Sequence, residues 1–323
     1  MTWPASPLLR VPGKLFLLGE YAVLAGGPAL LTVTKDRALR LEKSSTPRRE
    51  GYSLLGPSFP NPRALPELIL QTLDLPLEEL DSFQIDLREF YSPEGEKLGL
   101  GSSAASTVAF VKALCPDEPA AEQAKRALEI HRAFQDGHGS GADIYACAHN
   151  SPIAYQIDTP DPGFRDFDFQ PLGSAPPSTP ITLPRDLQFY GIWTGAPAST
   201  TSFMGALRER IRADKEATLE LQGLFHRIAA ISSAGIEAAQ VQSSEAFLDA
   251  LFQGDKAMEA LGDFADLPIL TERHRFLREK AKAAGFVLKP SGAGGGDFSI
   301  LAGPIDKPLP AFVEDHLLVS LRH

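Results

Sequence analysis

The order of hydrophobic and polar positions predicts a chain of mixed strands and helices. Two apolar runs within "KLFLLGEYAVLAGGPALLTVT" (residues 14–34) have strand character and are separated by turns that contain glycine. "SFQIDLREF" (82–90) alternates as a half-buried strand does. "RALRLEK" (37–43) and "GYSLLG" (51–56) flank the polar stretch 44–50, which predicts a hairpin with its tip there.

Helical spacing is prominent further along the chain. A helix is expected to begin at Ser102 or Ser103 and to end near Cys115, before Pro116. Further helices are predicted over 119–134, 203–240, 243–261 and 309–321, and strands over 187–195 and 297–303. The Pro- and Asp-rich residues 158–186 predict a boundary region. Strands and helices without strict alternation favour an α+β protein of two domains.

Composition narrows the possible partners. With 31 basic and 41 acidic residues the net charge is −10, which argues against nucleic acid or an anionic membrane as a partner. Cys115 and Cys147 form no disulfide framework or metal-ligand spacing, so a cytoplasmic protein is expected. No apolar run reaches membrane-spanning length, and the first residues lack a signal-peptide core. A monomer or a homodimer is expected.

Three glycine-rich loops are the candidate ligand-binding or catalytic segments. "LGLGSSAAST" (98–107) places two glycines ahead of a helix start, where free N–H groups and the helix dipole suit a phosphate. It fits a loose dinucleotide fingerprint, but polar residues separate it from the preceding strand. "DGHGSGAD" (136–143) reads either as a pair of helix caps or as a site for Asp143. "KPSGAGGGD" (289–297) has so many glycines that close approach to a ligand or another loop is favoured.

A family resemblance connects these loops. "PGKLFLLGEYAVLAGGPAL" (12–30), "KLGLGSSAAST" (97–107) and "KPSGAGGGDFSI" (289–300) are similar to the three ordered motifs of the GHMP kinases. The resemblance implies an N-terminal domain like domain 2 of ribosomal protein S5 over residues 1–180. It also implies a ferredoxin-like C-terminal domain over 181–323, with the active site between the two.

Within the family the details resemble the bacterial phosphomevalonate kinase branch. "GEY" (19–21), "GAGGGD" (292–297), "WTGAPAST" (193–200) and Lys97 each match that branch. The resemblance implies ATP-dependent phosphorylation of (R)-5-phosphomevalonate, in the mevalonate pathway of isoprenoid biosynthesis, with Mg²⁺ as cofactor. A mevalonate kinase, with a hydroxyl acceptor, is the main alternative, and a sensor that binds a small molecule without turnover is a further one.

The resemblance also assigns roles to residues. Lys14 and Asp143 are the expected catalytic residues, and Ser103 is the expected Mg²⁺ ligand. The ATP phosphates are expected to bind Gly99, Leu100, Gly101, Ser102, Ser103 and Ala104. The acceptor is expected to bind Lys14, Tyr21, Lys97, Ser140, Ser199, Thr200, Ser291, Gly292, Ala293 and Gly294. A second metal carboxylate stays open between Glu129 and Asp136, and His131 is interpreted as a packing residue with a satisfied ring.

Overall fold

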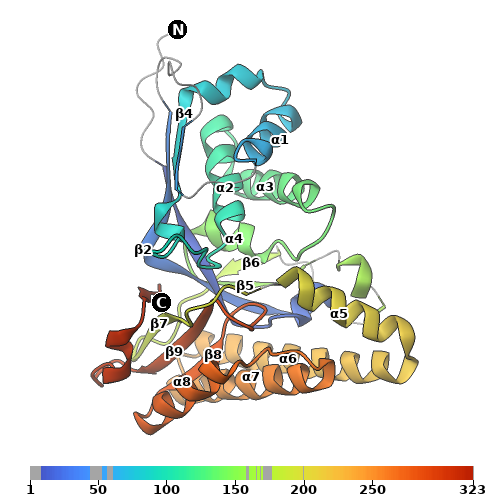
Figure 1. Cartoon of the computed structure of the whole chain (residues 1–323), viewed down its shortest axis with the longest axis vertical. Helices are drawn as coiled ribbons and strands as arrows, with labels where there is room; N and C mark the ends of the chain where they lie inside the picture. Colours follow the sequence, from blue (N-terminus) through green and yellow to red (C-terminus); the bar gives the residue numbers. More distant parts are fainter. Residues whose placement is uncertain are drawn as a thin grey trace.

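The molecule has an upper and a lower part, each built on its own sheet (Figure 1). The computed structural model describes residues 9–43, 53–56, 61–157, 160–164, 166, 167, 169, 177–198 and 200–322. Ser199, one of the predicted substrate residues, lies outside the described residues.

The first sheet is organised around one long strand. Its strands are β1 (Leu9–Leu18), β2 (Ala29–Lys43), β3 (Ser53–Leu55), β4 (Phe83–Asp86), β5 (Ile153–Tyr155) and β6 (Ser178–Pro180). β1 runs antiparallel along one edge of β2, while β4 and β5 pair with opposite ends of its other edge. β3 and β6 then extend the sheet outward from β4 and β5.

Helices cover one face of this sheet. They are α1 (Ala64–Thr72), α2 (Ser102–Leu114), α3 (Ala120–Phe134) and α4 (Ala142–His149), with short 3-10 helices at Ala22–Ala25, Leu77–Ser82, Arg88–Phe90 and Pro162–Phe164. The predicted helices at 102–115 and 119–134 are confirmed as α2 and α3. Almost every side of α2 is buried, because it packs on β1 and β2 and is surrounded by the other three helices. Its small residues permit that close packing.

The lower part pairs a second sheet with the longest helices. The antiparallel strands β7 (Leu187–Trp193), β8 (Val287–Pro290), β9 (Phe298–Pro304) and β10 (Leu318–Ser320) lie in the order β10-β7-β9-β8. The helices are α5 (Thr200–Ala213), α6 (Lys215–Gln240), α7 (Ser244–Ala265) and α8 (Glu272–Ala283), with a 3-10 helix at Ala311–Asp315. The predicted run 203–240 divides at Asp214, whose side chain caps α6 by accepting from Glu216 N. Among the described residues, none of the helices has the length and apolar character needed to span a membrane.

Two sequence predictions were wrong. The predicted hairpin between 37–43 and 51–56 does not form, because β3 pairs in parallel with β4 and β4 lies between β3 and β2. The tip residues 44–50 lie outside the described part of the chain. The predicted helix 309–321 is a 3-10 turn followed by β10, whose short apolar run completes the sheet edge beside β7. Periodicity alone does not separate helix from strand in such a run.

The end of the described chain joins the two parts. Leu321 forms a β-bridge with Thr34 of β2, and Arg322 N donates to Val33 O at 2.9 Å. Thr32 Oγ1 donates to Arg322 O at 2.7 Å. The largest apolar cluster likewise mixes side chains of both parts, including Leu15, Phe110 and Phe298. The domain boundary at residue 180 stays a prediction, with β6 ending the first sheet and β7 beginning the second.

A buried ion pair also joins the two parts. Lys289 of β8 and Glu20, which follows β1, are 1% and 2% exposed, and Lys289 Nζ lies 2.5 Å from Glu20 Oε1. Lys289 Nζ also donates to Pro290 O at 2.6 Å. Burying two charges is costly, and their mutual attraction and extra hydrogen bonds must compensate that cost.

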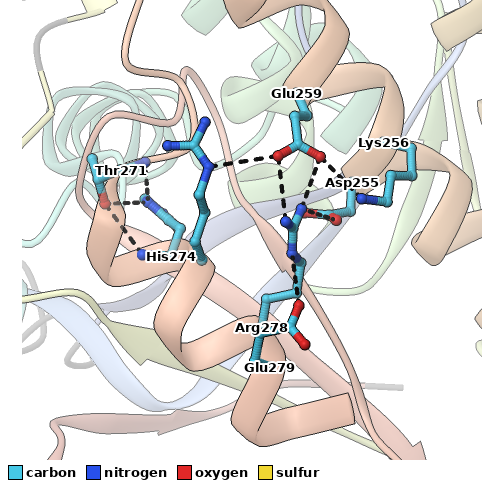
Figure 2. Close-up of polar contacts among 8 residues, drawn as sticks. Asp255, Lys256, Glu259, Thr271, His274, Arg278 and Glu279 are labelled. Atoms are coloured by element: carbon cyan, nitrogen blue, oxygen red, sulfur yellow. Dashed lines mark hydrogen bonds and ion pairs between the residues drawn. The ribbon is translucent and has the colours of Figure 1, made fainter.

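A cluster of charges joins α7 and α8 (Figure 2), and the charge of Lys289 acts on one of its members, Asp255. Arg278 Nη1 donates to Asp255 Oδ2 at 3.1 Å and to Glu259 Oε2 at 3.0 Å. Burial raises the pKa of Asp255, while Arg278 and Lys289 act in the opposite direction. Thr271 and His274 form the capping box that begins α8.

We predict that Lys289→Met lowers the free energy of unfolding by about 3–5 kcal/mol, because Glu20 stays buried without its partner. The double variant Glu20→Gln/Lys289→Met should recover part of that loss. Urea denaturation measures both. The control is Lys282→Met on the exposed side of α8, which should change stability by less than about 0.5 kcal/mol. Equal, small effects of Lys289→Met and Lys282→Met would contradict the argument.

Candidate active site

Two of the three glycine-rich loops, 136–143 and 289–297, line one cavity of about 550 Å³, and Lys14, which contacts the first loop at Gly101, lines it as well. The wall contributed by β1 and the following turn includes Lys14, Phe16, Tyr21, Val23 and Leu24. The second loop contributes residues 138–141 and Asp143, and the third loop contributes Gly292 and Ala293. Met204 and Arg208 of α5 complete the lining. The cavity is therefore built by both parts of the molecule.

The loop 98–103, called the phosphate loop below, approaches Lys14 and Asp297 closely because Gly99 and Gly101 carry no side chains. Gly99 and Gly101 have φ of +71° and +82°, a region that favours glycine. A Cβ at Gly101 would lie 3.0 Å from Lys14 Cε, and a Cβ at Gly99 would lie 2.2 Å from the Asp297 carboxylate. Lys14 N donates to Leu100 O at 2.9 Å, which holds the loop against β1. The loop then enters α2, whose first N–H groups lack partners within the helix.

Ser103, in the first turn of α2, contacts a histidine. His131 is 2% exposed on α3, and its Nε2 lies 3.1 Å from Ser103 Oγ. The interpretation of His131 as a buried residue with a hydrogen-bonded ring is confirmed. The sequence did not reveal that the partner is Ser103, since the two residues lie on different helices.

Lys14 and Asp143 face the same cavity from β1 and from the first turn of α4. Asp143 Oδ1 accepts from Ile144 N at 3.0 Å, which orients the carboxyl group. Both charges act on the buried thiol of Cys147: burial raises its pKa to about 12, Asp143 adds to the rise, and Lys14 opposes it. The predicted catalytic pair is thus brought together, and Cys147 stays a protonated core residue.

The turn after β1 is fastened to the third loop. Tyr21 has φ +62°, an uncommon value for a residue with a side chain, and its hydroxyl donates to Ala293 O at 2.6 Å. Burial, and then the charge of Glu20, raise the pKa of Tyr21, so the hydroxyl keeps the proton that it donates. Ser291 Oγ accepts from Phe16 N and donates to Phe16 O, both at 2.9 Å. Its hydroxyl therefore joins strand to loop, while Gly292 and Ala293 line the cavity.

Lys97 precedes the phosphate loop in the chain. It is exposed and does not line the cavity, but its charge and that of Lys14 both act on Asp297. Asp297 Oδ1 accepts from Ala198 N at 3.1 Å, and its carboxylate packs on Gly99. Burial raises the pKa of Asp297, while Ala198 N–H and the two lysines oppose the rise. The aspartate of the third motif therefore connects the third loop to the phosphate loop.

The remaining predicted residues divide between the cavity and its surroundings. Ser140 lines it and accepts from Ala142 N at 3.3 Å, whereas Gly294 packs against Ile269 behind the third loop. Thr200 begins α5, and nothing is described of its side chain. Asp136 lines the cavity, while Glu129 is exposed on α3 and does not.

Sequence reasoning missed one group of cavity residues. Arg208 of α5 reaches the lining and pairs with Asp161, which is 1% exposed at the side chain, with Arg208 Nη2 2.9 Å from Asp161 Oδ1. His138 Nδ1 lies 3.2 Å from Asp161 Oδ2. Three arginines alternate along α5 at 208, 210 and 212, and no local signal distinguishes the one that faces the cavity.

Comparison with known proteins identifies the family. The model of the GHMP kinases N terminal domain matches residues 68–151, which hold both the phosphate loop and Asp143. The phosphomevalonate kinase of Streptomyces sp. (strain CL190) is 28% identical over 93% of this chain and 91% of its own. Residues 68–151 therefore match the GHMP kinase family, and the chain is similar along most of its length to a phosphomevalonate kinase.

Solved structures share the fold of this chain. Streptococcus pneumoniae phosphomevalonate kinase in complex with phosphomevalonate and AMPPNP superimposes with a TM-score of 0.72 at 22% identity, covering 92% of each chain. L. major mevalonate kinase in complex with R-mevalonate gives a TM-score of 0.68 at 19% identity, covering 98% of this chain and 92% of that one. The predicted α+β fold of two domains is confirmed.

We predict that Gly99→Ala weakens ATP binding by at least about tenfold, because the new Cβ must displace the Asp297 carboxylate and with it the phosphate loop. The measurement is the Kd for ATP by titration calorimetry. Gly95→Ala is the matched control: its φ is +88°, but a Cβ there meets nothing within 4 Å. Equal ATP affinities in the two variants would show that the close approach at Gly99 does not matter for the nucleotide.

Proposed function

We propose that this protein transfers the γ-phosphoryl group of ATP to the phosphate of (R)-5-phosphomevalonate, forming the 5-diphosphate. The observation that carries the proposal is a cavity lined by Lys14 and Asp143 directly beside the phosphate loop, in a chain related along most of its length to a phosphomevalonate kinase. The cavity is a pocket for a small molecule, and the loop adjoining it has the form of a phosphate cradle.

The phosphate loop and Lys14 would position the donor. The N–H groups of residues 99–104 lie at the start of α2, where the helix dipole favours negative charge. Ser102, whose buried side chain bonds to Tyr91, is proposed to contact the phosphates as well. Lys14 passes along Gly101 and reaches the cavity, so its ammonium group can lie between donor and acceptor. Phosphoryl transfer depends mainly on such positioning and on neutralising charge.

The residues beside the loop fit Mg²⁺ delivered with the nucleotide. Ser103 supplies an oxygen ligand, while the described residues contain no group of three or more His, Cys, Asp or Glu that could hold a metal alone. Such a donor set suits Mg²⁺, which commonly takes one or two protein ligands and completes its shell with phosphates and water. When bound, Mg²⁺ neutralises charge on the β- and γ-phosphates. Ser103 would hold it, and the cavity carboxylate Asp136 is preferred over Glu129 as a second ligand.

Asp143 would orient the acceptor. A phosphate monoester has a second pKa of about 6 and is mostly dianionic at pH 7, so it needs a general base less than a hydroxyl does. The charges of Lys97 and Lys14 both act on Asp297, and the two lysines would meet the acceptor phosphate where it approaches the donor. Ser140, Ser199 and Thr200 are proposed to contact the acceptor as well.

Two alternatives give different results in one assay. A mevalonate kinase shares this fold and would use the same phosphate loop with a hydroxyl acceptor. A sensor would bind ligands without turnover, but Lys14, Ser103 and Asp143 are all present.

We predict that phosphomevalonate is preferred over mevalonate by at least about a hundredfold in kcat/KM, or about 2.7 kcal/mol. Mevalonate has a hydroxymethyl group where phosphomevalonate has its phosphate dianion, so the cations that would bind the phosphate are left without a partner. Release of ADP, coupled to a dehydrogenase, measures both rates with Mg²⁺ and ATP. Equal or faster turnover of mevalonate would assign the mevalonate kinase activity instead, and no turnover of either acceptor would favour the sensor.

Lys14→Met should reduce kcat/KM by at least about a hundredfold, as the loss of a charged group at the transferring phosphoryl does elsewhere. Asp143→Asn should reduce it less, because a phosphate acceptor is already deprotonated at pH 7. Asp117→Asn, in an exposed loop, is the control for a lost carboxylate. If Asp143→Asn alone abolishes turnover, the acceptor is a hydroxyl that needs a base.

A further inference from the structure

Resting on the proposed function, we infer that Arg208 binds the carboxylate at the far end of the acceptor, opposite the end that is phosphorylated. Arg208 is a cavity-lining arginine without a role in the phosphoryl transfer described above. Its neighbours are Asp161, His138 and Phe164, whereas Lys14 adjoins Leu100 and Gly101. The two cations therefore stand on different walls of the same cavity.

The hydrogen bonds of Arg208 leave donors free for a ligand. A single nitrogen, Nη2, donates to both Asp161 oxygens, at 2.9 and 3.0 Å. A guanidinium group carries five N–H donors, and within the described residues none of its hydrogen bonds uses Nη1. An arginine that served only to neutralise Asp161 would gain more from a two-nitrogen contact. Nε is buried beside Gly163, so the arrangement fixes the guanidinium at Nη2 and leaves Nη1 for an anion.

Asp161 gives Arg208 a rigid anchor. Its side chain is 1% exposed, and Oδ1 also accepts from Gly163 N at 2.9 Å. Burial acts to raise the pKa of Asp161, but Gly163 N–H, His138 and Arg208 outweigh it and hold the pKa below its usual value. The Arg208 guanidinium carbon also lies 5.9 Å from the centre of the Phe164 ring. An ionised, immobile partner and an aromatic neighbour orient the guanidinium before any ligand arrives.

The cavity surface beside Arg208 matches the rest of such an acceptor. Val23, Leu24 and Met204 are apolar lining residues, while Lys14 and Arg208 are the lysine and arginine of the lining. A short branched aliphatic chain with an anion at each end would place its carbon atoms on the apolar residues and one anion on each cation. Phosphomevalonate has this chemistry, with a phosphate at one end and a carboxylate at the other.

Three ligands distinguish binding of the acceptor's carboxylate from binding of its phosphate. Phosphomevalonate carries both anions, mevalonate carries only the carboxylate, and 3-methylpentane-1,3,5-triol 5-monophosphate carries only the phosphate. Titration calorimetry with the full chain gives the Kd of each probe. Arg208→Gln should weaken phosphomevalonate and mevalonate by the same factor, at least about tenfold, which corresponds to one lost charge-assisted hydrogen bond. It should leave the triol monophosphate within about twofold of the wild type.

The matched control is Arg212→Gln, which removes the same charge from the exposed side of α5 and should change none of the three values. Because Arg208→Gln leaves Asp161 buried without its cation, Asp161→Asn/Arg208→Gln is measured beside it and should show the same pattern. Equal loss for all three probes in that double variant would mean that Arg208 only supports the fold. Loss confined to the two phosphate-bearing probes would assign Arg208 to the phosphate, and unchanged affinities would remove it from the site; each overturns the inference. Wild-type turnover is read separately by ADP release, so a failed reaction and a failed carboxylate contact are told apart.

Discussion

The buried contact between Glu20 and Lys289 is the constraint on which the active site depends. The two residues are 269 positions apart, and each stands at the base of a loop that forms a cavity wall. Tyr21 follows Glu20 and bonds to Ala293, and Ser291 lies two residues after Lys289 and bonds to Phe16. An ion pair in a dry interior tolerates little displacement, because each charge is costly without the other. The spacing between the turn after β1 and the third loop (289–297) is therefore fixed by contacts within the protein and not by the ligand.

The phosphate loop is held by a backbone hydrogen bond to β1 and by close packing at two glycines, which carry no side chain. Lys14 N binds Leu100 O, Lys14 passes over Gly101, and Asp297 occupies the space beside Gly99. β1, the phosphate loop and the third loop are distant in sequence but meet at Gly99 and Gly101, where a Cβ would not fit. Gly99 and Gly101 are thus explained by close contacts with two distant residues, Asp297 and Lys14.

Much of the candidate site was predictable from the sequence because its motifs are short segments of the chain. The glycine spacing before α2 and the serines at its start are read along the chain, as are Lys14 in an apolar strand and Asp143 in the first turn of a helix. What could not be predicted depends on distant contacts. β3 pairs with β4 and not with β2, and β10 is an edge strand although its apolar run also allowed a helix. Arg208 is held at the cavity by its ion pair with Asp161. The partnership of His131 with Ser103 depends on how α3 packs on α2.

The backbone contacts of β2 with Leu321 and Arg322, called the seam below, affect how the chain can fold during synthesis. Val33 and Thr34 leave the ribosome early, yet their partners Arg322 and Leu321 are made almost three hundred residues later. Contacts between such distant residues form slowly, and domains otherwise fold as they emerge. A nascent chain can pair β1 with β2 and pack α2 on them, but this seam stays open until translation has passed residue 322. Until then the incomplete kinase exposes a strand edge, which is the kind of surface that chaperones protect from aggregation.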